Sequence, residues 1–593
     1  MRPFTKVLVA NRGEIAIRIF RTLRELGIES VAVYSEADRD SLHVASADDA
    51  YLLGGGPPAQ SYLRGDRIVE TALRAGAEAV HPGYGFLAEN ASFARAVADA
   101  GLTWIGPPPE AIEAMGSKIA ARERMQAAGV PVVPGTTTPV STPADVEQAA
   151  SEIGYPVAVK ASAGGGGKGL KIVRSPDEVE RALESARREG EAYFADPTVY
   201  VERYLDDPRH VEVQVLADDH GNVVHLGERD CTIQRRHQKL VEETPSPAVD
   251  AALRERIGRI AIDAARAVGY RSAGTIEGLL AQDGSYFFLE MNTRIQVEHT
   301  VTEAVTGIDI VREQIRVAAG EPLSFTQAHV VLRGHAIECR INAEDAAHGF
   351  LPSPGRITAY REPAGIGVRV DSGVRAGDEV SGLYDPLVAK LVVHDVDREH
   401  ARRRMVRALE EFVINGPTTL LPFHRALLES PCFVAGETCR ELVESDQLAE
   451  RAQQLRQTFA HRTTTLPAAA DGTHPRTRER VLSLELDGRR HEVRLHVPAP
   501  QWAELARRHR GRTKGLAGGT SGAVVSPMQG TVLSVAVSEG EHVEAGGLIC
   551  VVEAMKMENE IVAHRDGVVA GLVVAPGDQV ASGQLVCVVE PGG

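Results

Sequence analysis

The sequence predicts a multidomain protein of mixed α/β and α+β structure that ends in a small all-β module. The chain has 593 residues, which is more than one hydrophobic core usually organises, so three or more domains are expected. Residues 1–115 alternate short apolar runs with amphipathic stretches, a rhythm typical of strands and helices in turn. Residues 523–592 contain two copies of a pattern of β-branched runs broken by glycine-rich turns, which indicates a quasi-symmetric β-sandwich.

Composition narrows the classes of function. A hydrophobic content of 43% and a charged content of 25% are ordinary for a globular protein in water. The net charge of −16 argues against a general nucleic-acid binder. No apolar run approaches the roughly 18–20 residues needed to span a bilayer. A strand begins almost at once, at Lys6, and leaves no room for a targeting peptide, so we expect a cytoplasmic protein with no membrane partner.

The six cysteines show no metal-ligand spacing. They are scattered over the chain, at positions 231, 339, 432, 439, 550 and 587. In a cytoplasmic protein this pattern favours reduced, mostly buried thiols.

The N-terminal region predicts a parallel sheet with helices on its faces. An apolar strand over 7–10 is followed by a turn at 11–14 and by apolar residues at helical spacing over 15–26, and the next strand covers 30–34. No Gly-x-Gly-x-x-Gly motif is present, so the pattern does not indicate a dinucleotide site.

A glycine-rich loop between two strands predicts a phosphate-binding lid. The strand over 156–160 ends in Lys160, and a second strand covers 170–173. Lys168 is followed by glycine rather than by Ser or Thr opening a helix, so this is not a Walker P-loop. Backbone N–H groups of such a loop can surround phosphate oxygens, although a solvated flexible loop is the alternative. The loop contains Gly165, Gly166, Gly167 and Lys168.

A predicted hairpin places two carboxylates opposite each other. Asp283-Gly284 is a strong signal for a two-residue hairpin loop, and with that loop Glu277 pairs with Glu290. Facing carboxylates repel unless a cation lies between them. Alternation puts Asn292 on the face of Glu290, and such oxygen ligands suit Mg²⁺ (or Mn²⁺) held jointly with nucleotide phosphates. In the alternative, both acids point to solvent.

The charged run 228–239 is too polar for a core strand. It is either a solvated face or, inside an anion-binding site, a source of hydrogen-bond donors.

The C-terminal repeat places a lysine at a hairpin tip. The two copies are 530–532, 539–543 and 548–553, and then 567–569, 576–580 and 585–590. Lys556 lies at their junction between two methionines, which put apolar surface where solvent normally favours polar residues. A solvated lysine is the alternative. The Ala-Met-Lys-Met sequence resembles that of biotin-carrier domains, which carry biotin on the lysine amine, whereas lipoyl domains usually have Asp-Lys-Ala there.

Residues 4–447 resemble the ATP-grasp fold and, within it, the biotin carboxylase family. The motifs that carry the resemblance are those of residues 10–16, 81–85, 115–118, the glycine-rich loop, 290–299, 338–345 and 384–386. The resemblance implies ATP-dependent carboxylation of biotin.

The resemblance also implies roles for individual residues. ATP is expected to contact Lys118, Lys160, the glycine-rich loop with Lys168, Glu202, Leu205, His210, Gln234 and His237. The magnesium ligands are expected to be Glu277, Glu290 and Asn292. Bicarbonate is expected to be held by Lys239, Arg294, Gln296 and the Val297 backbone. Glu298 matches the general base and Arg340 the group that stabilises the biotin enolate, a role that suits a planar, permanently charged donor.

These roles fit the chemistry that the family performs. Bicarbonate is a poor electrophile, and ATP activates it as carboxyphosphate, which releases CO₂ in a closed site. Closure of the glycine-rich loop would exclude water, which otherwise destroys the intermediate.

The expected domain organisation has five parts. Residues 1–115, 116–330 and 331–447 form the carboxylase, 448–522 a linker with one β-hairpin, and 523–592 the carrier. Residues 463–472 are linker-like, and a basic, then glycine-rich stretch over 507–522 would let the carrier swing. Because an isolated hairpin is barely stable, the hairpin over 482–497 is expected to pack against a neighbour, and it is a candidate docking element.

The resemblance therefore indicates the biotin-bearing α subunit of an acyl-CoA carboxylase, with acetyl- or propionyl-CoA as acceptor. The implied partners are a biotin protein ligase and a separate carboxyltransferase β subunit, in a hetero-oligomer with dimerised or higher-order α subunits. The alternative is the equivalent subunit of a pyruvate carboxylase or another biotin enzyme. A carrier or assembly protein with an inactive ATP site is disfavoured, because the complete set of expected catalytic residues is present.

Overall fold

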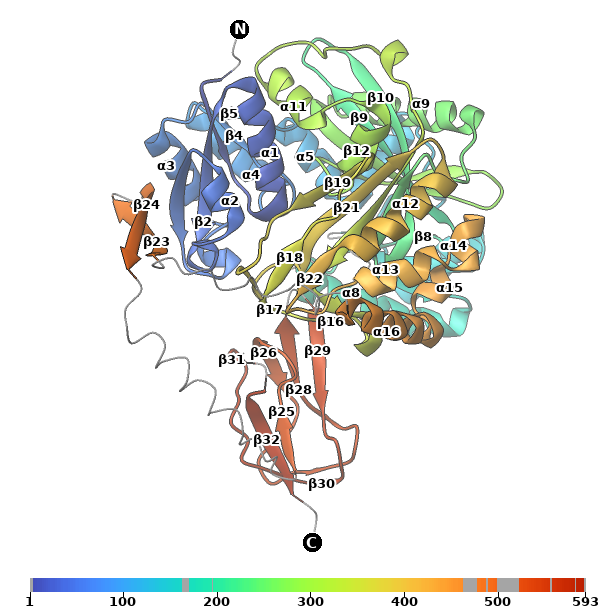
Figure 1. Cartoon of the computed structure of the whole chain (residues 1–593). Coiled ribbons are helices and arrows are strands. Elements are labelled where there is room, and N and C mark those ends of the chain that lie inside the picture. Colours follow the sequence, from blue (N-terminus) through green and yellow to red (C-terminus); the bar gives the residue numbers. More distant parts are fainter. Residues whose placement is uncertain are drawn as a thin grey trace.

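The computed structural model describes residues 4–162, 170–194, 196–461, 477–486, 489–498, 522–554, 557–581 and 583–590. Figure 1 shows residues 4–461 as the large upper body and the strands of residues 523–590 as a separate small unit below it. Among the described residues no helix is both long and apolar enough to cross a membrane.

The N-terminal sheet has the predicted parallel order. Its five parallel strands are β3 (Asp49–Gly54), β2 (Glu29–Ser35), β1 (Lys6–Val9), β4 (Ala79–His81) and β5 (Thr103–Trp104). Helix α1 (Gly13–Leu26) connects β1 to β2, and it buries Ile15, Ile19 and Leu23 as the spacing predicts. It ends at Gly27, whose φ of 69° is the left-handed conformation that favours glycine at a helix C-terminus.

An eight-stranded antiparallel sheet is built from strands between residues 209 and 395 and carries the site described below. Its order is β13 (Tyr286–Asn292), β12 (Ser272–Leu280), β9 (Arg209–Ala217), β10 (Val223–Arg235), β11 (Gln238–Thr244), β14 (His335–Asn342), β21 (Leu387–Asp395) and β19 (Val368–Ser372). Because one sheet contains all eight strands, every second side chain along each strand contributes to one continuous face.

A three-stranded sheet flanks the central sheet. It has the order β7 (Leu170–Val173), β6 (Val157–Ala161) and β8 (Val199–Arg203), and it packs against α8 (Val179–Phe194) and α7 (Pro143–Ile153). Lys160 pairs with Leu170 across β6 and β7, so the strand–loop–strand prediction is confirmed. The loop itself, with Gly165, Gly166, Gly167 and Lys168, lies outside the described residues.

Helices and short strands complete the part of the fold that precedes the linker. Helices α12 and α13 pack on the sheet and on each other, and α13 contacts α16 (Figure 1). The helices not yet given are α2 (Leu42–Ser46), α3 (Gly65–Ala75), α4 (Ala91–Asp99), α5 (Pro109–Gly116), α6 (Lys118–Ala127), α9 (Ala251–Ala267), α10 (His299–Thr306), α11 (Ile310–Ala318), α12 (Arg398–Glu411), α13 (Leu421–Leu428), α14 (Pro431–Ala435), α15 (Arg440–Val443) and α16 (Asp446–His461). The short strands are β15 (Glu344–Asp345), β16 (Leu351–Pro352), β17 (Gly355–Arg356), β18 (Ala359–Arg361), β20 (Glu379–Val380) and β22 (Val413–Asn415).

The predicted hairpin of the linker is present and lengthens the N-terminal sheet. Strands β23 (Thr477–Leu486) and β24 (Arg489–Pro498) pair antiparallel, with Leu482 opposite Val493. Strand β24 joins the edge of β3 through Arg489 and Tyr51. The prediction that this hairpin packs against a neighbour is therefore confirmed, and the neighbour is strand β3.

The C-terminal region forms the predicted small β-sandwich, and its two copies exchange strands. One sheet has the order β25 (Ala523–Val525), β32 (Leu585–Glu590), β30 (Gly567–Ala570) and β27 (His542–Val543). The other has β29 (Met557–Val562), β28 (Leu548–Ala554), β26 (Gly530–Val535) and β31 (Gln579–Val580). Each sheet thus receives the short second strand of the other copy, so both copies share one apolar core.

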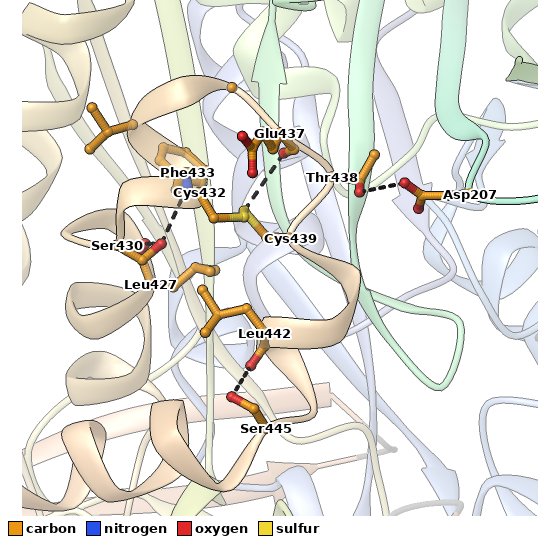
Figure 2. Close-up of a disulfide and its surroundings, with 12 residues drawn as sticks. Asp207, Leu427, Ser430, Cys432, Phe433, Glu437, Thr438, Cys439, Leu442 and Ser445 are labelled. Atoms are coloured by element: carbon orange, nitrogen blue, oxygen red, sulfur yellow. Dashed lines mark hydrogen bonds between the residues drawn. A yellow bond between two sulfur atoms is a disulfide. The ribbon is translucent and has the colours of Figure 1, made fainter. Parts of the chain in front are cut away.

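The expectation of six reduced thiols is wrong for one pair. Cys432 and Cys439 form a disulfide between α14 and the residue before α15, with Cα atoms 5.7 Å apart (Figure 2). Cys439 has a φ of 50°, which turns the chain back toward α14, and sequence spacing does not reveal such a turn. The other four cysteines are free and buried, as expected.

Candidate active site

The hairpin of β12 and β13 brings the two predicted carboxylates together. Glu277 pairs directly with Glu290, and Asn292 follows on the same strand. The predicted two-residue loop is wrong, because Ala281 already pairs with Ser285 and leaves a three-residue loop. Gly284 in that loop has a φ of 81°, and the register shifts by one residue between Glu277 and Gly278. This β-bulge compensates for the longer loop and restores the pairing that the sequence predicts.

Polar side chains continue this row across the sheet. Glu277 on β12 lies opposite Glu212 on β9, and Glu212 lies opposite Arg229 on β10. The row therefore places three acidic residues and one arginine at the same level of four adjacent strands. Glu212 and Arg229 are fully buried, so their charges must be satisfied by one another and by neighbours.

Lys239 on β11 forms the centre of the cluster. Its Nζ donates to Glu212 Oε2 at 2.5 Å, to Glu277 Oε1 at 2.9 Å and to Glu298 Oε1 at 2.6 Å. Burial alone would lower the pKa of this amine, but the three carboxylates outweigh it and hold the pKa well above its usual value. Lys239 is consequently a cation, and its three donors are all engaged.

Glu298 is held between two cations. Arg340 Nη2 donates to Glu298 Oε2 at 2.9 Å, on the side opposite Lys239, and Arg340 Nε donates to Glu242 at 2.5 Å. Burial favours the neutral acid, but Lys239 and Arg340 lower the pKa of Glu298 below its usual value. Burial raises the pKa of Glu242 to about 7.

The segment before Glu298 supplies the other residues expected to hold an anion. Gln296 Nε2 donates to Glu277 Oε1 at 2.8 Å. Arg294 donates to Glu89 at 2.9 Å and to Asn292 Oδ1 at 2.8 Å. The carbonyl of Val297 accepts from the buried Lys390 at 2.9 Å.

The residues expected to contact ATP gather beside the carboxylate pair. Lys160 donates to Glu202, which also accepts from Arg122 at 3.3 Å. Glu202 is only 3% exposed, and its side chain is occupied by these two cations. Lys118 Nζ lies 3.9 Å from Glu290 at the start of α6.

Four further residues are expected to contact ATP. His210 Nε2 lies 3.0 Å from Glu277. Burial lowers the pKa of His237, and so do the positive charges of Lys160 and Arg440. Gln234 donates to the carbonyl of Cys231, and Leu205 is half-buried after β8. Lys556 lies outside the described residues, so its setting stays a prediction.

The residues at the metal position fit a divalent cation. Burial, and then the charge of Glu277, raise the pKa of Glu290, so the pair resists ionising together without a cation. The Glu290 side chain is 34% exposed and has one amine at 3.9 Å, whereas Glu277 is already bound to Lys239 and His210. With Asn292 these carboxylates provide the oxygen donors that Mg²⁺ prefers.

Sequence reasoning missed several polar residues of the site. These are Glu89, Glu212, Arg229, Glu242 and Lys390, each in contact with an expected site residue. A signal existed for Glu212, because His210, Glu212 and Gln214 alternate with valines and so share one face of β9. Glu89 and Lys390 come from other elements, and no local pattern connects them to the site.

Four family models match the chain and together span most of it. Residues 3–112 match the biotin carboxylase N-terminal domain, and residues 338–445 match the biotin carboxylase C-terminal domain. Between them, residues 117–326 match the ATP-binding domain of the carbamoyl-phosphate synthase L chain. Residues 522–590 match the model of biotin-requiring enzymes.

Two curated relatives are similar over long stretches. The biotin-dependent acyl-coenzyme A carboxylase alpha3 subunit of Mycobacterium leprae is 47% identical over 573 residues, which is 94% of each chain. One subunit of the pyruvate carboxylase of Methanothermobacter thermautotrophicus is 54% identical over 471 residues, which is 77% of this chain and 95% of the relative.

A solved structure supports the same assignment. The biotin carboxylase domain dimer of Hydrogenobacter thermophilus 2-oxoglutarate carboxylase, in complex with MgADP, ADP and bicarbonate, has a TM-score of 0.73 and 48% identity. The match covers 75% of this chain and 98% of that domain. The chain therefore belongs to the biotin carboxylase family of ATP-grasp ligases and carries a biotinyl domain on the same polypeptide.

Proposed function

We propose that this protein is the biotin-bearing α subunit of an acyl-CoA carboxylase of the acetyl- or propionyl-CoA type. It uses ATP and bicarbonate to carboxylate biotin held on Lys556, and a separate carboxyltransferase β subunit passes the carboxyl group to the acyl-CoA. The similarity to the mycobacterial alpha3 subunit over 94% of both chains supports this proposal, because that match includes the linker and the carrier.

The observation that carries the carboxylation half of the proposal is the contact between Glu298 and both Lys239 and Arg340. A base for bicarbonate and a cation for the biotin enolate must act on one small volume, since the CO₂ released from carboxyphosphate is short-lived. Glu298 is ionised at neutral pH and therefore able to accept a proton. Arg340 lies on its far side, where it can stabilise negative charge on the ureido oxygen of biotin.

Bicarbonate would lie beside Glu298. Lys239, Gln296 and Arg294 supply donors of the kind that bind an oxyanion, and the Val297 backbone adjoins them. In the resting arrangement these donors are paired with carboxylates, so an arriving anion exchanges with existing partners.

The magnesium ion is assigned to Glu277, Glu290 and Asn292. The bound ion would neutralise phosphate charge during transfer to bicarbonate. Lys118, Lys160, Glu202, Leu205, His210, Gln234, His237 and the glycine-rich loop with Lys168 are proposed to bind the nucleotide. The MgADP complex of the Hydrogenobacter domain supports this arrangement.

Two features of assembly belong to the proposal. The Hydrogenobacter biotin carboxylase domain is a dimer, and we propose that this carboxylase region also dimerises. A biotin protein ligase is the partner needed to attach biotin to Lys556.

The second candidate is the equivalent subunit of a pyruvate carboxylase. The 54% identity to the Methanothermobacter protein favours it, but that match covers 77% of this chain, against 94% for the acyl-CoA carboxylase alpha3 subunit.

One experiment separates these functions. Biotinylated protein is incubated with ATP, Mg²⁺ and labelled bicarbonate, and then with acetyl-CoA, propionyl-CoA or pyruvate, with and without the carboxyltransferase chain that co-purifies from the native source. Label is expected on protein-bound biotin in every case, and on acyl-CoA only when the second chain is added. Labelled oxaloacetate would support the pyruvate carboxylase instead, and label on acyl-CoA without a second chain would overturn the need for a β subunit.

A further inference from the structure

Arg229 on β10 is a buried arginine whose donors are all used inside the protein. Its side chain is 0% exposed. An arginine carries five N–H donors in a rigid planar fork. All five have acceptors: Nε donates to Glu212 Oε1 (2.6 Å), Nη1 to Gln214 Oε1 (2.7 Å) and Thr302 Oγ1 (3.0 Å), and Nη2 to Thr275 Oγ1 (3.1 Å) and Gln296 Oε1 (2.7 Å). The orientation of this guanidinium is therefore fully determined.

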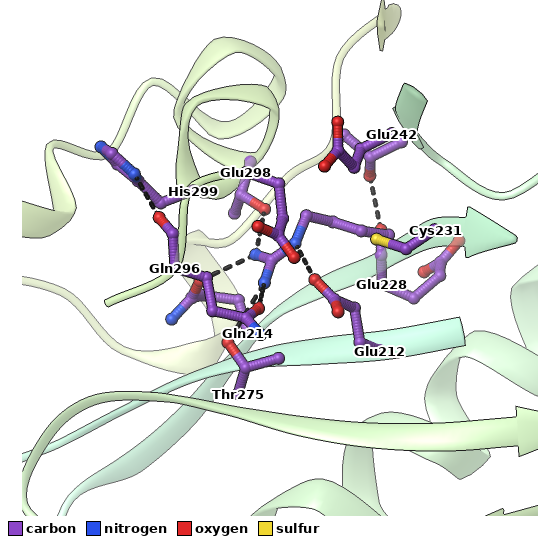
Figure 3. Close-up of polar contacts among 12 residues, drawn as sticks. Glu212, Gln214, Glu228, Cys231, Glu242, Thr275, Gln296, Glu298 and His299 are labelled. Atoms are coloured by element: carbon purple, nitrogen blue, oxygen red, sulfur yellow. Dashed lines mark hydrogen bonds and ion pairs between the residues drawn. The ribbon is translucent and has the colours of Figure 1, made fainter. Parts of the chain in front are cut away.

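The acceptors of Arg229 come from several elements and converge. Figure 3 shows Glu212, Gln214, Thr275 and Gln296 turned toward one another, with Glu298 directly beside them. Gln296 belongs to the segment after β13, whereas the other three lie on β9 and β12. Arg229 thus connects the segment before Glu298 to strands β9 and β12 through hydrogen bonds.

The contact with Gln296 fixes which end of its amide faces the site. Its Oε1 accepts from Arg229, and its Nε2 donates to Glu277 Oε1 at 2.8 Å. A flipped amide would place N–H groups against the guanidinium N–H groups and an oxygen against the carboxylate, and would lose both bonds. The donor end of Gln296 is thereby held toward the carboxylates around Lys239.

Arg229 and Lys239 donate to the same carboxylate. The Glu212 carboxylate that accepts from Arg229 through one oxygen accepts from Lys239 through the other. Arg229 itself has no donor left to offer an anion, so any influence on binding passes through its neighbours.

We propose that Arg229 is a positioning residue that presents the Nε2 donor of Gln296 to bicarbonate. The proposal rests on the bicarbonate role given above to Gln296 and deepens it. A lysine at position 229 would keep the positive charge but could not bond Glu212 and Gln296 at once in a fixed plane.

The test is the substitution Arg229→Lys, measured by bicarbonate-dependent ATP cleavage in the full-length protein. The KM for bicarbonate is expected to rise about tenfold or more, because a charge-assisted hydrogen bond is lost, whereas the KM for ATP stays close to wild type. Thr302→Val is the matched control, since it removes another acceptor of the same guanidinium without touching Gln296. An unchanged bicarbonate KM in Arg229→Lys, or an equal rise in Thr302→Val, would overturn the proposal. Absence of bicarbonate-dependent ATP cleavage in the wild type would instead overturn the function it rests on.

A second pair of variants serves if Arg229→Lys does not fold. Gln296→Glu keeps an acceptor for Arg229, whereas Gln296→Met leaves an N–H of Arg229 unpaired in the protein interior. Both are expected to raise the bicarbonate KM, because Gln296→Glu places a carboxylate oxygen against Glu277 where the donor stood and Gln296→Met removes the donor. A bicarbonate KM equal to that of the wild type in both variants would show that Gln296 presents no donor to bicarbonate.

Discussion

Glu298 illustrates how one residue obtains its chemistry from its neighbours. It is buried to 1% exposure, a setting that ordinarily favours the neutral acid. Lys239 and Arg340 contact its two oxygens separately and keep it ionised. Lys239 is also expected to bind bicarbonate, and Arg340 is expected to bind the biotin enolate. The cations that keep the proposed base ionised are therefore the ones expected to bind the two substrates.

We expect Glu298→Gln and Arg340→Ala to bind ATP almost normally and to lose at least a hundredfold in biotin carboxylation, which is the scale of a missing general base. The reason is that neither side chain contacts a residue expected to hold the nucleotide. ATP affinity by calorimetry and carboxylation of free biotin provide the two readouts. A large loss of ATP affinity with carboxylation otherwise intact would contradict these roles.

Glu344 provides a pH-dependent prediction away from the site. It is buried, it accepts from Asn342 at 3.2 Å, and burial raises its pKa to about 7, against 4.5 for an ordinary glutamate. A raised carboxyl pKa means that the folded protein binds the proton more tightly than the unfolded chain does, so the protonated carboxyl stabilises the folded state. This stabilisation is complete below pH 4.5 and is lost as the pH rises through about 7. It contributes about 3 kcal/mol at most to the free energy of unfolding.

We therefore expect Glu344→Gln to reduce the fall in unfolding midpoint between pH 5 and pH 7.5, since glutamine does not titrate. Differential scanning fluorimetry across that range makes the measurement, and the exposed Glu36→Gln is the control. An identical pH profile in wild type and Glu344→Gln would show that Glu344 is not the group responsible.

The β12–β13 hairpin shows how an element places two ligands. Its strands pair Glu277 with Glu290 although the loop is one residue longer than the sequence predicts, because the β-bulge takes up the difference. The hairpin is thus the element on which the proposed magnesium site depends.

We expect Glu277→Gln and Glu290→Gln each to raise the Mg²⁺ concentration needed for half-maximal activity severalfold and to lower turnover, because each removes an anionic oxygen ligand. Titration of ATP cleavage with Mg²⁺ gives both numbers. Unchanged Mg²⁺ dependence in both variants would exclude them as ligands.

The disulfide-closed loop is an element that the sequence did not reveal. Thr438 of this loop donates to Asp207 at 3.0 Å, in the segment between Leu205 and His210 (Figure 2). Arg209 of the same segment donates to the carbonyl of Gly436. That segment lies between two residues expected to contact ATP. We therefore expect the disulfide to stabilise the position of the segment from Leu205 to His210.

We expect the double change Cys432→Ser and Cys439→Ser to lower the free energy of unfolding by about 2–3 kcal/mol, from the entropy of the opened loop, and to weaken ATP binding. Chemical denaturation and calorimetry supply the measurements. Dithiothreitol should reproduce both effects in the wild type and leave the double variant unchanged. If reduction alters neither property, the disulfide has no such role.

Local patterns predicted some elements well and others not at all. The period-2 pattern and the Asp-Gly signal were enough to pair Glu277 with Glu290, because both depend only on neighbouring residues. The bulge at Gly278 has no marker in the sequence, and the Cys432–Cys439 disulfide depends on a turn at Cys439, whose positive φ no residue pattern announces. Glu89, Arg229 and Lys390 reach the site only through tertiary packing, whereas the alternation along β9 could have identified Glu212.

At the scale of the whole molecule, the carboxylase and the carrier contribute different parts of one reaction. The carboxylase region is built around the eight-stranded sheet, and the carrier has its own core and a closed sandwich. Biotinylation and carboxylation are therefore expected to be separable by mutation.

We expect Lys556→Arg to abolish biotinylation and overall carboxylation, since arginine has no acylable amine, but to leave ATP-dependent carboxylation of free biotin within about twofold of wild type. Streptavidin blotting and a free-biotin assay make the two measurements. Capture of the variant on streptavidin would rule out Lys556 as the attachment site.

The strand order of the carrier sets how far its tip can reach. Strands β28 and β29 pair up to Ala554 and Met557, so these two residues lie at one end of the sandwich. Strand β29 runs from there to the turn at Arg565, whose guanidinium donates to the carbonyl of Val589, and the Val589 N–H donates to Gly522. The linker thus enters at the opposite end, and the domain acts as a rigid lever of about 20 Å, the length of a six-residue strand. A rotation about Gly522 therefore moves the far end of the domain, at Ala554 and Met557, through a larger arc than any other part of it.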